Sequence, residues 1–89
     1  DIRPDADLAL FPNPTTGVFS LTARLPQGNT ELEIYDTVGR VVYTAAQPNW
    51  DGSRWEIDLS GRMPGIYLVR VGSDVLEKPV IFKAQLQAE

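Results

Sequence analysis

Short runs in which hydrophobic and polar residues alternate cover most of this chain. Residues 18–23 and 30–35 both follow this pattern, which is typical of β-strands with one face in a core and the other in solvent. The positions expected to point inward are Phe19, Leu21, Leu32 and Ile34. No window of similar length has a convincing helical period, so the pattern favours an all-β fold.

The stretch from Ile57 to Val71 organises the rest of the chain. A strand that ends near Leu59 leads into the tight corner Ser60–Gly65, and a run of β-branched and aromatic residues, Ile66–Val71, follows at once. This second run is apolar on one face and mostly apolar on the other. The pattern therefore predicts a central strand that is covered on both faces or nearly so.

Turn residues separate the other strands. Asp36–Gly39 has Asp first and Gly fourth, which indicates a type I turn closing a hairpin. Residues 47–53 are expected to form a polar loop with Trp50 at its middle, and Pro79 predicts that the last strand is an edge strand or bulged. The expected strands are 8–11, 18–23, 30–35, 40–44, 55–59, 66–71 and 75–83. About seven strands at this spacing indicate an antiparallel β-sandwich.

The length of 89 residues allows one domain. We expect a flexible lead-in over residues 1–7, where Pro4 interrupts a polar run, a sandwich over residues 8–83 and a tail over residues 84–89. The absence of Cys and His removes thiolate metal sites, disulfides and the commonest general base. No cofactor is expected.

The charge of the chain also limits the classes of molecule that it is expected to bind. A formal net charge of −4 and a pI near 4.6 argue against nucleic acid, whose phosphates would repel the domain. No apolar run approaches the roughly 20 residues that a membrane-spanning helix needs. The N-terminus lacks the features of an export signal, and the absence of an initiating Met fits a segment of a longer polypeptide.

Four sequence blocks carry a family resemblance. In order, they are FPNPTTGVF (11–19), ELEIYDTVGRVVY (31–43), IDLSGRMPGIYLVRV (57–71) and VIFK (80–83). Together they resemble the C-terminal sorting domain of the type IX, or Por, secretion system. The residues that match its motifs are Pro12, Asn13, Pro14, Gly17, Gly39, Arg40, Asp58, Leu59, Gly65, Tyr67, Val69 and Lys83. The chain departs from the family pattern at Pro79 and in residues 84–89, which extend past the terminal lysine.

The resemblance implies a folded signal rather than an enzyme. Members of this family have an immunoglobulin-like β-sandwich and lie at the end of secreted cargo proteins. An outer-membrane translocon recognises the domain after export to the periplasm, and a sortase-like cysteine peptidase at the cell surface typically removes it. The cargo then stays on the surface or reaches the medium. Any cleavage position is expected in or before residues 1–8.

Most of the matched residues have a structural explanation as well as a functional one. The three matched glycines are expected to serve backbone geometry at turns, and Tyr67 and Val69 to lie in the core. Arg40 either contacts the translocon or pairs with Asp36 or Asp58. Val80, Ile81, Phe82 and Lys83 are the main candidates for translocon recognition, because an edge strand can add to a strand of a receptor. Alternatively, they only close the sandwich.

An accessory module that binds carbohydrate or protein is the alternative function. Trp50 is its candidate sugar platform, since Trp55 is expected to be buried. Asp51, Asp58 and Asp74 lie in separate turns without the ligand spacing of a calcium site. No pair of carboxylates is placed for hydrolysis, so we expect no catalytic residue.

Overall fold

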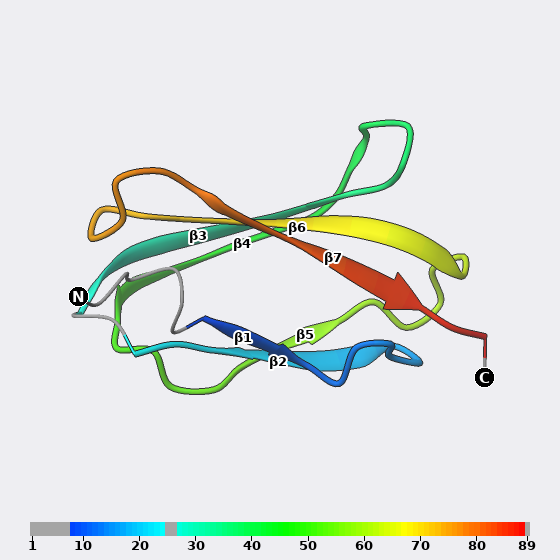
Figure 1. The fold of residues 1–89 in the computed structure, drawn as a ribbon, viewed down its shortest axis with the longest axis horizontal. Helices are drawn as coiled ribbons and strands as arrows, with labels where there is room; N and C mark the ends of the chain where they lie inside the picture. Colours follow the sequence, from blue (N-terminus) through cyan, green and yellow to red (C-terminus); the bar gives the residue numbers. More distant parts are fainter. Residues whose placement is uncertain (1–7, 25–26, 89) are drawn as a thin grey trace.

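A computed structural model describes residues 8–24 and 27–88 as two antiparallel sheets packed face to face. The expected lead-in over 1–7 and the expected cleavage region lie outside the described residues, apart from Leu8. The strands are β1 (Ala9–Phe11), β2 (Val18–Thr22), β3 (Gly28–Tyr35), β4 (Val41–Trp50), β5 (Trp55–Asp58), β6 (Gly65–Ser73) and β7 (Val80–Leu86). Their order is β1-β2-β5 in one sheet and β4-β3-β6-β7 in the other (Figure 1). The prediction of an all-β, immunoglobulin-like antiparallel sandwich of about seven strands is confirmed by the seven strands of residues 8–24 and 27–88.

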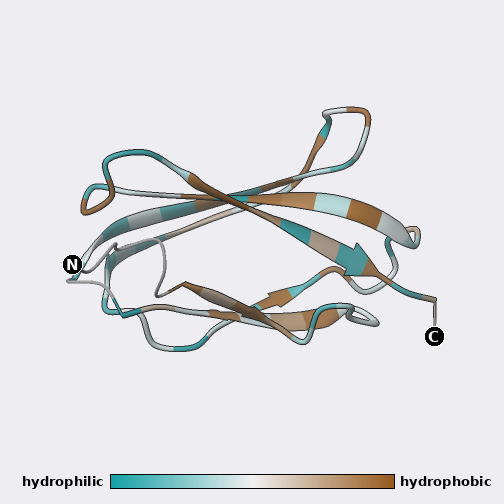
Figure 2. Ribbon diagram, in the orientation of Figure 1, coloured by the Kyte–Doolittle hydropathy of each residue, from teal (hydrophilic) through white to brown (hydrophobic). Residues whose placement is uncertain are grey.

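The core lies between the sheets and contains the positions that alternation placed inward. Hydrophobic residues are concentrated in the strands of both sheets (Figure 2). The side chains that are fully removed from solvent include Phe19, Leu21, Leu32, Ile34, Ile57, Leu59, Val69 and Val71. Tyr67 is also buried, so the expected core positions of Tyr67 and Val69 are confirmed. Burial of this apolar surface is the main force that holds a disulfide-free domain together.

The central strand β6 is covered on one face only. It lies between β3 and β7, which confirms its central place in the sheet. Its outward side chains Ile66, Leu68 and Arg70 are partly or largely exposed, with Leu68 at 41%. The prediction that both faces are covered was wrong, because residues 8–24 and 27–88 form two layers and none of them packs as a third layer on this face.

The fourth strand is longer than the sequence predicted. It runs through the expected polar loop as far as Trp50, paired with β3 across a register shift between Gly28 and Thr30. The placement of Trp50 at the middle of an exposed loop was wrong. Its indole is 4% exposed and meets Trp55 edge to face, with ring centroids 5.4 Å apart. The burial of Trp55 is confirmed.

The closing strand also extends further than expected. It begins after Pro79, forms the edge of the four-stranded sheet and runs past Lys83 to Leu86. Ala84 and Leu86 are buried in the core, so the expected tail is wrong for these residues. The extension is explained by pairing with β6, which continues to Gly65 opposite Leu86.

Candidate functional site

The sequence blocks that carry the resemblance meet at one end of the sandwich. The β1–β2 turn, the β3–β4 hairpin, the β5–β6 corner and the end of β7 all lie at the right-hand end in Figure 1. These segments are far apart in sequence, and hydrogen bonds join them. We call this region the motif end, defined by residues 12–17, 36–42, 58–67 and 83–87.

The β1–β2 turn binds the outer edge of β7. The Asn13 side chain donates from Nδ2 to the Lys83 carbonyl at 2.8 Å and accepts from the Gln85 N–H at 3.0 Å. Thr15 continues the pairing, donating its N–H to the Gln85 carbonyl at 2.9 Å and accepting from the Gln87 N–H at 2.7 Å. The end of β7 therefore has its outward backbone groups satisfied by the turn, and its edge is closed from the Lys83 carbonyl onward.

The same turn is fixed to the β5–β6 corner. The Gly17 carbonyl accepts the Leu59 N–H at 2.8 Å, and a side chain at Gly17 would collide with the Ser60 hydroxyl. The corner itself is stabilised by Asp58, whose carboxylate accepts the Ser60 N–H at 2.8 Å. Gly17, Gly39 and Gly65 all have positive φ, at 154°, 93° and 150°, which supports a role of the three glycines in backbone geometry.

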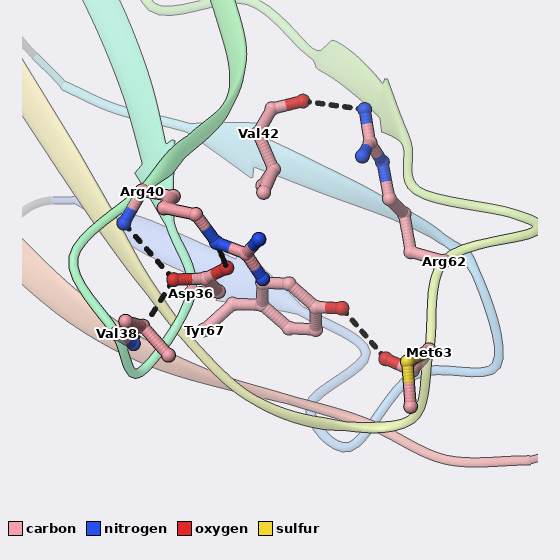
Figure 3. Close-up of polar contacts among 7 residues, drawn as sticks. All are labelled: Asp36, Val38, Arg40, Val42, Arg62, Met63 and Tyr67. Carbon is pink, nitrogen blue, oxygen red and sulfur yellow. Dashed lines mark hydrogen bonds and ion pairs between the residues drawn. The ribbon is translucent and has the colours of Figure 1, made fainter.

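The hairpin turn is organised by Asp36. Its carboxylate oxygen Oδ1 accepts the N–H groups of Val38 and Arg40 at 3.0 and 2.9 Å, and Oδ2 accepts Nε of Arg40 at 2.8 Å (Figure 3). Arg40 thus pairs with Asp36 and not with Asp58, although its side chain remains 77% exposed. These donors hold the pKa of Asp36 below its ordinary value of 3.8, with the backbone N–H of Arg40 as the largest cause.

We expect the Asp36 turn to stabilise the domain above about pH 4 and to lose this effect in acid. The pKa of Asp36 is lower in the folded chain, so the stabilisation is fully present above the unfolded value and disappears as the pH falls through the folded value. Thermal unfolding of the wild type and of Asp36→Asn across that range is the measurement. The two melting temperatures are expected to differ at neutral pH and to approach each other as the pH falls below the ordinary pKa of 3.8. A difference that stays constant across the range would contradict this account.

The β5–β6 corner and the hairpin enclose a hollow of about 310 Å³. Arg62 reaches from the corner to the start of β4, donating Nη2 to the Val42 carbonyl at 2.7 Å. The Tyr67 hydroxyl donates to the Met63 carbonyl at 2.6 Å and holds the corner over the core (Figure 3). Val38 and Met63 line the hollow and are the most exposed large hydrophobic side chains in the described part of the chain, at 77% and 80%.

The structure places the candidate recognition residues in two groups. Arg40 lies at the hollow, whereas Lys83 lies on the β7 edge with Ile81, which is 60% exposed. Val80 and Phe82 are half-buried and pack against the core. Sequence reasoning missed Arg62 and Met63. One feature of the sequence could have indicated them. A tight turn does not need a long apolar or a long cationic side chain for its geometry, yet this turn contains one of each.

The described residues offer no constellation for metal chemistry. Residues 8–24 and 27–88 contain no group of three or more acidic, His or Cys side chains arranged to hold a metal ion. No helix in this part of the chain has the length and hydrophobicity to span a membrane. The carboxylate of Asp51 accepts the Ser53 N–H at 2.9 Å, which gives this acid a role in its own turn.

Comparison with known proteins identifies one family. The family model described as "secretion system C-terminal sorting domain" matches residues 9–82, from the start of β1 into β7. The curated proteins contain no match to the chain. The matched segment includes three of the four segments that form the motif end.

Proposed function

The chain belongs to the family of type IX secretion C-terminal sorting domains, and from this premise we propose that it directs a cargo protein of the same chain through the outer-membrane translocon to the cell surface. The observation that carries the proposal is the family match over residues 9–82. A domain of this family acts as a sorting signal for secretion through the outer membrane. The proposed role involves no catalysis and no cofactor.

We propose two contact regions for the translocon, both from residues singled out in the sequence. Arg40 belongs to the first, and Val80–Lys83 to the second. On β7, Ile81 and Lys83 point outward, while Val80 and Phe82 face the core. The Asn13 side chain already donates to the Lys83 carbonyl. A receptor strand could therefore pair only with the part of β7 that precedes this carbonyl.

We further propose that a sortase-like cysteine peptidase at the surface removes the domain from the cargo. This step follows the family resemblance, and the outcome is cargo on the cell surface or in the medium. The sugar-binding alternative depended on an exposed Trp50. Trp50 lies in the core and presents no indole face to solvent, so nothing in the site supports this alternative.

The direct test is the location of a periplasm-exported fluorescent reporter fused ahead of residues 1–89. In a type IX-competent host we expect the reporter on the surface or in the medium, and in a translocon-deficient host we expect it in the periplasm. Retention in the periplasm of both hosts would contradict the proposed function. Fractionation followed by fluorescence is the measurement.

The β7 contribution is tested by changing exposed side chains rather than by deleting the strand, because deletion would remove core residues. The double variant Ile81→Ser with Lys83→Gln is expected to reduce export about tenfold, as loss of interface residues worth 1.4 kcal/mol would do. The matched control is the double variant Val18→Ser with Arg24→Gln, since Val18 is 47% exposed on the other sheet and Arg24 is also exposed outside β7. Equal export by both variants would exclude β7 side chains from recognition.

A further inference from the structure

The hollow at the motif end has the properties of a binding site for an apolar protein segment that carries a carboxylate. Two cationic side chains line it, Arg40 from the hairpin and Arg62 from the corner (Figure 3). Among residues 8–24 and 27–88, the only acidic side chain in its lining is Asp36. The wall therefore carries one more positive than negative charge, on a chain whose formal net charge is −4.

Arg62 holds the charge that is not neutralised. The Asp36 carboxylate already forms an ion pair with Arg40 at 2.8 Å and accepts the backbone N–H groups of Val38 and Arg40. The ion pairs among residues 8–24 and 27–88 are Arg40–Asp36 and Arg70–Glu33. Arg62 donates instead to a neutral carbonyl of Val42, so its guanidinium keeps its charge and further N–H groups for a ligand.

Exposed apolar side chains also line the hollow that Arg62 borders. Val38 and Met63 stand on either side of the hollow with about four-fifths of their surface in solvent. Exposed hydrophobic side chains that gather around a hollow mark interaction sites on soluble domains, and arginine next to apolar anchors is typical of interface hot spots. A sugar polyanion would leave these apolar walls unpartnered, whereas an apolar peptide segment with a carboxylate would contact both features.

We infer that the Arg62 hollow binds an apolar segment of the outer-membrane partner protein through an aspartate or glutamate side chain. The carboxylate pairs with the guanidinium of Arg62, and the flanking apolar residues cover Val38 and Met63. This inference rests on the proposed function and names the chemistry of the partner at one of its contact regions. It also assigns binding roles to Arg62 and Met63, which the sequence analysis did not predict.

Export of the reporter fusion gives the first test. Arg62→Gln is expected to reduce translocon-dependent export about tenfold, since the charge-assisted hydrogen bonds to the carboxylate of the partner would be lost. Met63→Ser is expected to reduce it as well, and Arg24→Gln, an equal change of charge at an exposed position outside the motif end, is expected to leave it unchanged. Melting temperatures close to that of the wild type establish that the variants are folded.

The outcomes separate this inference from the proposed function. If the wild-type fusion is not exported in a translocon-dependent way, the proposed function fails. If the wild type is exported and Arg62→Gln and Met63→Ser are exported equally well, the function stands and the role of the hollow is overturned. A loss of export with Arg24→Gln as large as with Arg62→Gln would also overturn it, because general charge would then be the cause.

Cross-linking identifies the chemistry of the partner. The chain has no cysteine, so Thr37→Cys, at an exposed position in the lining of the hollow, gives a unique thiol for a photoreactive maleimide in a fusion whose reporter lacks reactive thiols. After illumination with outer membranes from a type IX-competent host, we expect an adduct on a protein segment that contains Asp or Glu. This adduct should be lost when Arg62→Gln is added and should be absent with Lys78→Cys, an exposed position in the β6–β7 loop.

Other cross-linking results would overturn the inference. An adduct on glycan would replace the protein segment with a surface polysaccharide. The inference would also be contradicted by an adduct on a peptide without a carboxylate, by an adduct that persists with Arg62→Gln, or by the absence of any adduct at Thr37→Cys.

Discussion

Replacing Trp50 with alanine is expected to lower the free energy of unfolding by about 3–5 kcal/mol. The indole is 4% exposed, packs edge to face on Trp55 and donates Nε1–H to the Ser53 carbonyl at 2.9 Å. Removal of the ring would leave a cavity between the sheets and an unpaired carbonyl. Because a domain of this size has roughly 5–13 kcal/mol in total, the loss is a large fraction of its stability. Urea or thermal unfolding measures it.

Trp50→Phe separates packing from hydrogen bonding at this position. It keeps an aromatic ring and removes the N–H, so we expect a loss of about 1–2 kcal/mol. Phe11→Ala is the control for an aromatic residue that is 42% exposed, and it should cost less than Trp50→Ala. An unchanged melting temperature in Trp50→Ala would place the indole in solvent and restore the sugar-binding alternative.

Replacing Gly52 with alanine is expected to cost about 2–5 kcal/mol, the sum of left-handed backbone strain and overpacking. Gly52 has φ at 88°, and its carbonyl accepts the Ala23 N–H at 2.9 Å. A Cβ at this position would collide with the Ala23 carbonyl. The two backbone segments would have to move apart at the connection between the sheets. Thermal unfolding of the purified domain is the measurement.

Gly61→Ala is the matched control for Gly52→Ala. Gly61 has nearly the same φ, 85°, but a Cβ there would meet nothing within 4 Å. Only the backbone strain remains, for which we expect about 1–2 kcal/mol. Equal losses in the two variants would mean that close approach to Ala23 contributes nothing.

The candidate site was only partly accessible to sequence reasoning. The blocks around Asn13, Arg40 and Gly65 were recognised one by one, but nothing in their spacing indicates that they meet at one end. Asn13 and Lys83 are 70 residues apart and touch only because β1 and β7 belong to facing sheets. Among the described residues, the charge of Arg62 is not paired with a carboxylate, and this is likewise apparent only when its neighbours in space are known.

The errors have a common physical origin. Alternation reports which residues can face a core, yet it does not report how many layers the fold has, so the outer face of β6 was expected to be covered. Strand ends depend on a partner strand, which is why β4 and β7 extend past the polar residues and the lysine that were expected to end them. These features come from pairing and stacking between distant segments.

The sequence by itself determined the all-β class, the Asp36 hairpin, most of the core and the family, because side-chain period, turn geometry and motif order are local properties of the chain. Only the tertiary structure decided the burial of Trp50, the closure of the β7 edge by Asn13 and the hollow between Arg40 and Arg62. Each of these depends on segments far apart in sequence, which are brought together by the burial of one shared core.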